Sequence, residues 1–154
     1  MTSLALHGIW FHEGRKMARW SERSRRHLQR QTPAITQQLL PEIPHSCTHV
    51  RGHGGVKGAL RQIHRGLPRA RFVARFDIAA YYDSMRHDVL RTQCAATDLY
   101  AEQQQSIADY LALPDTRGTG CGMVASGSLS PLLGGLYRAP LDRAMVRNSG
   151  RPRL

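Results

Sequence analysis

Apolar side chains recur at helical spacing in the middle of the chain. The recurring positions are Val56, Leu60, Ile63 and Leu67. Their period of three to four residues predicts a helix over residues 56–66, with basic side chains on its other faces. Gly66 and Pro68 are expected to end this helix, because neither residue favours its continuation.

Weaker helical patterns occur on both sides of this segment. They predict helices over residues 13–40, from about 83 to 96, over 100–112 and from Ser130 onward. Asp83 and Ser84 are expected to cap the second of these helices, and Pro131 suits the first turn of the last one. Pro140 is expected to kink that last helix. The segments 41–55 and 115–128 are rich in glycine and small polar residues, which predicts loops.

The stretch RARFVARFDI, residues 69–78, alternates instead of following a helical period. Phe72, Ala74, Phe76 and Ile78 share one face, whereas Arg71, Val73, Arg75 and Asp77 share the other. A period of two predicts a strand that buries its aromatic face and carries Asp77 on the polar face. One strand cannot form a stable sheet by itself. Either a strand pair lies in a weakly patterned region, or the chain belongs to a larger fold.

Asp77 has two interpretations from the pattern alone. The carboxylate can be solvated or paired with Arg75, which lies two residues away on the same face. Alternatively, a carboxylate at the end of a strand can hold Mg²⁺ for phosphoryl transfer, because this cation prefers oxygen ligands. Strand periodicity favours the first interpretation.

The charge of the chain points to a polyanionic partner. The 154 residues are 41% hydrophobic, which is compatible with a folded core, and carry a net charge of +11. Arginine dominates, since Lys16 and Lys57 are the only lysines. Guanidinium groups bind phosphate oxygens in pairs and stack on bases, so nucleic acid is the first candidate and an anionic membrane surface the second.

Cysteine usage and the absence of long apolar runs bear on location. Cys47, Cys94 and Cys121 are an odd, widely spaced set, which argues against a disulfide framework and fits a reducing cytoplasm. The first residues lack the pattern of a secretory signal, and no apolar run approaches the ~20 residues that span a bilayer. We therefore expect a cytoplasmic protein without a membrane partner.

Three short motifs have competing explanations. The potential zinc ligands His45, Cys47, His49 and His53 match no standard spacing, so a polar loop is the favoured interpretation. The glycines of residues 52–58, GHGGVKG, could hold a phosphate at a helix start, but the P-loop pattern is absent and a plain turn is favoured. The sequence ASGS is not the G-x-S-x-G of a hydrolase.

Three blocks together resemble bacterial reverse transcriptases of the retron and group II intron kind. FVARFDIAAYYDSMRHDVL is similar to their first catalytic motif, in which an acid at a strand end precedes an aliphatic residue and two aromatics. HVRGHGGVKGALRQI is similar to the segment before that motif, and GMVASGSLSPLLGGLYRAPLDRAM is similar to their second palm motif. The blocks occur in the family's order and cover about residues 35–146.

The resemblance implies a fold and a domain organisation. It predicts an α+β fold, a partial fingers and palm, mostly helical with an incomplete antiparallel sheet. The chain would divide into a basic N-terminal helical segment (1–40), the partial reverse transcriptase domain (41–146) and an irregular tail (147–154). Within the first segment, the arginines of residues 15–30 are explained either by a solvated helix or arm, or by contact with phosphates.

The resemblance also implies roles for single residues. Asp77 matches the acid that holds the catalytic Mg²⁺ ions, with help from the carbonyl of Ile78, and Tyr82 matches the aromatic beneath the incoming sugar. Gly127 and Ser128 match the turn that contacts the nucleotide. The implied nucleic-acid contacts are Arg51, Lys57, Arg61, Arg75 and Ser130. The implied partners are an RNA template, a DNA or RNA primer and deoxynucleotides.

Departures from the family pattern limit the expected activity. Val124, Ala125 and Ser126 replace the family's P-Q-G, and the fingers motif that grips the triphosphate is not recognisable. The Y-x-D-D acids are not found after Met145, and one carboxylate cannot hold two Mg²⁺ ions. The sequence RNSGRPRL is typical of a tail read after a truncation or frameshift, in which case a partner chain would supply the rest of the palm.

We therefore expect a fragment of an RNA-directed DNA polymerase that is inactive alone. The alternative is a non-enzymatic RNA- or DNA-binding fragment that uses the arginines of residues 15–30 and 51–75. A third interpretation is a remnant that does not fold stably.

Overall fold

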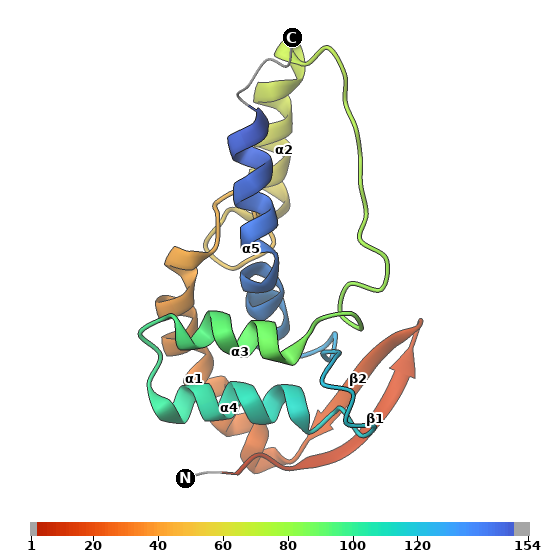
Figure 1. Ribbon diagram of the computed structural model, residues 1–154, viewed down its shortest axis with the longest axis vertical. Coiled ribbons are helices and arrows are strands. Elements are labelled where there is room, and N and C mark those ends of the chain that lie inside the picture. Colours follow the sequence, from red (N-terminus) through yellow and green to blue (C-terminus); the bar gives the residue numbers. More distant parts are fainter. Residues whose placement is uncertain (1–2, 150–154) are drawn as a thin grey trace.

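Helices and one pair of strands make up the computed structural model, which describes residues 3–149 (Figure 1). In chain order the elements are β1 (Leu6–His12), β2 (Arg15–Trp20), α1 (Glu22–Leu39), the 3-10 turn η1 (Leu40–Glu42), α2 (Gly55–Gly66), the 3-10 turn η2 (Leu67–Arg69), α3 (His87–Ala95), α4 (Ala101–Ala112) and α5 (Ser130–Ser149). The α+β class is therefore confirmed. A strand pair, one of the two alternatives that the pattern left open, lies at the N-terminal end of the described chain.

Strands β1 and β2 form an antiparallel hairpin in which Trp10 pairs with Met17. Glu13 and Gly14 join them with positive φ values of 49° and 73°, as two-residue turns of the primed type require. The helix expected over residues 13–40 is therefore wrong for its first part. Aromatic and β-branched residues before a Glu-Gly turn favour paired strands, and this local preference outweighs the weak helical pattern.

Helix α1 begins directly after β2. The hydroxyl of Ser21 accepts a hydrogen bond of 3.2 Å from the backbone N–H of Ser24, which caps the helix N-terminus, and Glu22 adds an acid in its first turn. Leu28, Ile35 and Leu39 point into the core from one face of α1. The chain then leaves the helix at Pro41.

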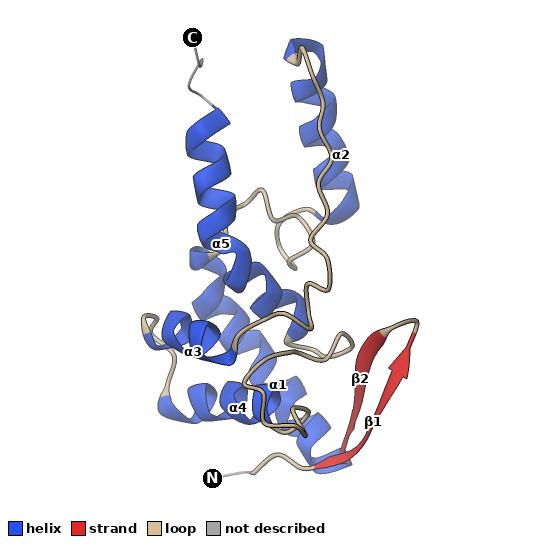
Figure 2. Ribbon diagram, turned by 45° about the vertical axis from the view of Figure 1, so that its right-hand side comes forward, coloured by secondary structure: helices blue, strands red, loops and turns tan. Residues whose placement is uncertain are grey.

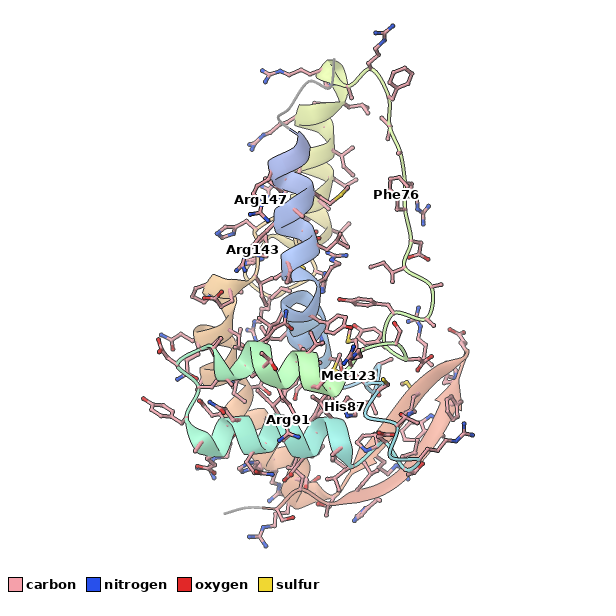
Figure 3. The ribbon with its side chains drawn as sticks, viewed as in Figure 1. Phe76, His87, Arg91, Met123, Arg143 and Arg147 are labelled. Atoms are coloured by element: carbon pink, nitrogen blue, oxygen red, sulfur yellow. The ribbon has the colours of Figure 1, made fainter. Side chains whose placement is uncertain are left out.

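Helices α1, α3, α4 and the first half of α5 form the body of the molecule, with the hairpin along one edge (Figure 2). Large side chains that are fully buried there include Ile35, Leu39, Met85, Leu90, Ile107, Tyr110, Leu111, Met123, Leu129 and Leu133. Figure 3 shows Met123 and His87 inside this body. The core is mostly aliphatic, as expected from a chain that is only 6% aromatic.

The predicted helices of the second half of the chain are present, with changes at their ends. Helix α4 has the expected bounds, whereas α3 begins at His87 instead of residue 83. Asp83 and Ser84 do not cap α3, because they belong to a turn closed by the hydrogen bond from Ser84 N to Ala80 O, 2.9 Å long. The cap position is Arg86, which has no side-chain capping bond.

Helix α5 begins at Ser130, as predicted, and contains Pro140. It continues to Ser149, so residues 147–149 are helical and the irregular tail expected over 147–154 is wrong for them. The remaining residues of that tail, 150–154, lie outside the described residues.

Helix α2 confirms the helix predicted over residues 56–66, but its apolar side chains do not join the core. It projects away from the body, and the chain reverses at η2 and returns along the length of α2 (Figures 1 and 2). Gly58 is the only buried residue of α2. The stripe formed by Val56, Leu60 and Ile63 is exposed.

The strand expected over residues 69–78 is not formed, and its aromatic face is not buried. Residues 70–78 are irregular and exposed, and Figure 3 shows Phe76 on the returning segment, outside the body. A strand requires a neighbour with which to exchange hydrogen bonds. Among residues 3–149, β1 and β2 pair only with each other, so the alternating sequence has no neighbour here.

None of the helices described for the chain has the length and apolar character that crossing a membrane would need.

Candidate functional site

Asp77 lies near the end of the exposed returning segment. Within the described part of the chain its carboxylate forms no hydrogen bond or ion pair, so the pairing with Arg75 that the pattern left open is not seen. Ile78, which follows it, is also exposed. Of the two interpretations open from the pattern, this geometry corresponds to a solvated carboxylate.

The two tyrosines after Asp77 fix the chain to the body. The Tyr81 hydroxyl donates a hydrogen bond of 2.6 Å to the backbone carbonyl of Gly134 on α5. Ala80 has a φ of 48°, which turns the chain sharply before this anchor. Burial raises the pKa of the Tyr81 hydroxyl, and burial also raises the pKa of Tyr82, against the opposing charge of Arg15. Both hydroxyls therefore stay protonated at neutral pH.

The loop before α5 packs on the same turn. The N–H of Met123 donates to the carbonyl of Tyr82 at 2.9 Å, and the N–H of Gly122 donates to the carbonyl of Met85 at 2.8 Å. On its other side, the N–H of Ala125 donates to the carbonyl of Lys16 in β2 at 2.8 Å. The loop thus joins the Tyr81–Tyr82 turn to the hairpin.

Ser130 is completely buried at the start of α5. Its hydroxyl donates to the carbonyl of Val124 at 2.6 Å and lies 2.7 Å from the hydroxyl of Tyr110. The expected contact of Ser130 with nucleic acid therefore does not fit this arrangement, since both partners of the hydroxyl lie inside the protein. Gly127 donates its N–H to the same Ser130 oxygen at 3.2 Å.

Gly127 and Ser128 reach the surface beside the hairpin. With Trp10, Arg19 and other side chains from the hairpin and α1, they line a cavity of about 290 Å³. Ile78 and Tyr82, the other two residues assigned to a nucleotide by the resemblance, do not line it. The structure therefore does not gather all four of these residues in one cavity.

The residues present do not fit the pair of Mg²⁺ ions that the resemblance implies. Among residues 3–149 no group of three or more His, Cys, Asp or Glu side chains is placed to hold a metal ion. Asp77 is an isolated exposed carboxylate, and two divalent cations need several oxygen ligands to offset their repulsion. We derive no catalytic step through these ions from this chain.

Of the side chains weighed as zinc ligands, Cys47 and His53 are buried in the loop of residues 43–53, whereas His45 and His49 are exposed. The rings of His45 and His53 lie 4.6 Å apart, and the Cys47 sulfur lies 3.5 Å from Nδ1 of His49. Arg138 of α5 donates to that sulfur over 3.5 Å. Burial raises the pKa of the Cys47 thiol, although Arg138 opposes the effect. A neutral, buried thiol is a poor metal ligand.

The cations assigned to nucleic acid lie on an exposed surface without acids. Arg51, Lys57, Arg61 and Arg75 are all exposed. Residues 43–76 contain no Asp or Glu, and in the described structure no cation of this range forms an ion pair. By contrast, Arg25, Arg26 and Arg138 are paired with carboxylates. The structure thus leaves the positive charge of residues 43–76 free for a polyanion.

The glycines before α2 adopt conformations that other residues avoid. Gly54 and Gly55 have φ values of 90° and 56°, and α2 begins with no acid and no side-chain cap. A side chain at Gly58 would place its Cβ only 3.1 Å from the carbonyl oxygen of His53. These features produce a tight turn, and they leave the first N–H groups of α2 without a side-chain partner.

Comparison of the chain with protein families, curated proteins and solved structures found no match. The family resemblance of the sequence blocks therefore stays a proposal.

The hairpin is the part of this region that pattern reasoning missed. It places Trp10 and Arg19 beside Gly127 and Ser128, whereas a helix had been expected from residue 13. The signal was present in the sequence: an aromatic run, LHGIWFH, followed by Glu-Gly and then RKMARW. A two-residue Glu-Gly turn between such runs indicates a hairpin.

Proposed function

We propose that the chain forms part of the fingers and palm of a reverse transcriptase-like polymerase and does not polymerise alone. Its role in the family reaction, template-directed addition of deoxynucleotides, would be to bind the RNA template and primer and to contribute Asp77. A second polypeptide would supply the missing acids. Mg²⁺ would be held only when those acids are present.

One observation carries this proposal more than any other. The two sequence blocks that resemble palm motifs are far apart in the chain, yet they contact each other directly. The N–H of Met123 bonds to the carbonyl of Tyr82, and the Tyr81 hydroxyl bonds to the carbonyl of Gly134. A polymerase site built from these two blocks requires such a contact, which supports the resemblance.

Primer extension with the purified chain tests the absence of activity. With an RNA template, an annealed primer, deoxynucleotides and Mg²⁺, we expect no incorporation above that of an Asp77→Asn variant, because one carboxylate cannot hold the metal pair. Incorporation that the Asp77→Asn substitution abolishes would contradict the inactivity and would show that the chain completes its own site.

The second candidate is a non-enzymatic nucleic-acid-binding protein. The acid-free surface of residues 43–76 favours it, since exposed Arg and Lys side chains without ion pairs bind phosphates by releasing counterions. Both candidates require RNA binding that weakens as salt is added. They differ in Asp77, which the first candidate needs for chemistry and the second does not need at all.

A further inference from the structure

Large apolar side chains of α2, of η2 and of the segment after them are exposed on the projecting part of the molecule. On α2, Val56 is 77% exposed, Leu60 60% and Ile63 58%, and Leu67 in η2 is 52% exposed. On the returning segment, Phe72 and Phe76 are 84% and 83% exposed. Single exposed apolar residues are common, but a set of this size marks a surface that binds something. We name residues 55–78 the projecting arm.

The backbone of the returning segment is also unsatisfied. In the described structure, residues 71–77 neither donate nor accept a backbone hydrogen bond. The neighbouring residues do: Ala70 N bonds to Leu67 O, and Ser84 N bonds to Ala80 O. A run of free N–H and C=O groups with an alternating sequence is what the edge of a β-sheet presents to an incoming strand.

The charges on the projecting arm define the partner further. When residues 71–77 are extended, Arg71 and Arg75 share the face opposite Phe72 and Phe76. Lys57, Arg61 and Arg65 lie beside the apolar stripe of α2. The arm contains no acid before Asp77. A complementary strand would be apolar on the face toward Phe72 and Phe76, and acidic on the other face.

We propose that residues 71–77 accept a β-strand from a second polypeptide, with alternating apolar and acidic side chains, and that the new strand pair packs its apolar face against α2. This deepens the proposed function by naming where the second polypeptide docks. The docking of the strand does not depend on the proposed function. Only the activity of the resulting complex rests on the proposed function. Arg75, which the resemblance assigned to nucleic acid, faces the partner strand instead.

Two other occupants fit this surface less well. A second copy of the chain, paired antiparallel about Ala74, would place Asp77 opposite Arg71 but Val73 opposite Arg75, so it would neutralise only one of the two arginines, whereas an acidic strand neutralises both. A nucleic acid would neutralise the cations, but it offers no partner for the aliphatic stripe of Val56, Leu60 and Ile63 and does not satisfy a strand edge. A polypeptide strand satisfies all three features.

The direct test uses two synthetic nine-residue peptides, one alternating valine with glutamate and one alternating valine with lysine. Binding of each labelled peptide to the full chain is measured by fluorescence anisotropy, and hydrogen exchange of the chain is followed in parallel. We expect the glutamate peptide to bind at least tenfold more tightly than the lysine peptide. We also expect it to slow exchange at residues 71–77 and not at other loops.

Substitutions in the exposed segment separate strand pairing from charge attraction. Ala74→Pro removes an N–H and should weaken the glutamate peptide at least tenfold, whereas Ala74→Ser, which keeps the N–H, should not. The double variant Arg71→Glu/Arg75→Glu should reverse the preference and bind the lysine peptide. Arg91→Glu/Arg117→Glu, which changes the same charge at exposed sites on the body, should leave the preference unchanged. Circular dichroism verifies that each variant folds.

Three results would overturn the inference. The first is equal binding of both peptides, or binding that Ala74→Pro leaves intact. The second is concentration-dependent self-association that Ala74→Pro abolishes, since this would make a second copy the occupant. The third is protection of residues 71–77 by single-stranded RNA and not by the glutamate peptide. None of these results depends on primer extension or on RNA binding elsewhere, so failure here is distinguishable from failure of the proposed function.

Discussion

Two glycines in the body lie where no side chain fits. A Cβ at Gly127 would overlap the ring and hydroxyl of Tyr110, and a Cβ at Gly135 would lie 2.8 Å from Cγ2 of Val50. Both positions bring the loop and helix that carry the second palm-like block close to their neighbours. These two glycines are therefore explained by packing, independently of any nucleotide.

This packing predicts the effect of Gly135→Ala. The added methyl group must displace Val50 and Ile43 in a filled core, so we expect the free energy of unfolding to fall by about 1–3 kcal/mol. Gly66→Ala is the matched control, because no atom lies within 4 Å of its added Cβ. It should be neutral or slightly stabilising, since alanine favours a helix. Thermal unfolding followed by circular dichroism measures both, and equal stabilities of the two variants would refute the packing.

The buried thiol of Cys94 predicts a dependence of stability on alkaline pH. Burial raises the pKa of this thiol from its ordinary value of 9.0 to about 11. At pH values between these two pKa values, the unfolded chain loses the thiol proton and the folded chain keeps it. The free energy of unfolding therefore falls as pH rises. The contribution to the loss is up to about 2 kcal/mol.

Denaturant unfolding from pH 8 to pH 11 measures this contribution. Above pH 9 the wild type should lose stability faster than Cys94→Ala. The difference between the free energies of unfolding of the two proteins should therefore shrink. Cys121→Ala, at a more exposed thiol, is the control and should follow the wild type. Parallel curves for the wild type and Cys94→Ala would show that the thiol titrates equally in both states.

At the scale of elements, the turn between β1 and β2 depends directly on the backbone preferences of its two residues, Glu13 and Gly14. Glu13 holds a positive φ, which costs free energy because the Cβ approaches the following carbonyl oxygen, and this conformation costs asparagine less. Glu13→Asn should therefore stabilise the chain by a few tenths of a kcal/mol, up to about 1. Gly14→Ala should destabilise it, because alanine resists positive φ. Thermal melting temperatures that move in the opposite directions would contradict the observed turn.

Local signals predicted some elements well and others poorly. Helix α2 has a strong apolar period, α4 is followed by Pro114, and both were predicted to within one residue of their observed bounds. The end of α5 was missed because the sequence from Val146 to Ser149 has little apolar period. The segment 70–78 has a strand pattern, but a strand also needs a partner, which no local pattern can supply.

At the scale of the whole molecule, some features of the candidate site could be predicted from the sequence and others could not. The order of the palm-like blocks was visible in the sequence, whereas the bonds between Met123 and Tyr82 and between Tyr81 and Gly134 that join them came from the fold. The burial of Ser130 was not predictable, because it depends on a hydrogen bond to Tyr110, which lies 20 residues away in the chain. The cations of residues 43–76 were visible as charge, but their exposure and lack of ion pairs needed the fold.

The central claim is that the cations of residues 51–61 on this acid-free surface, outside the strand-accepting residues 71–77, bind the phosphates of a nucleic acid. The most direct measurement is the affinity of the chain for a single-stranded RNA oligonucleotide at several salt concentrations, for the wild type and for Arg51→Gln/Lys57→Gln/Arg61→Gln. Each lost phosphate contact should lower the slope of log affinity against log salt by about 0.7, so the triple variant should lose about 2. The control Arg86→Gln/Arg91→Gln/Arg117→Gln should keep the wild-type slope. An affinity that does not change with salt, or a triple variant that binds as the wild type does, would contradict the account.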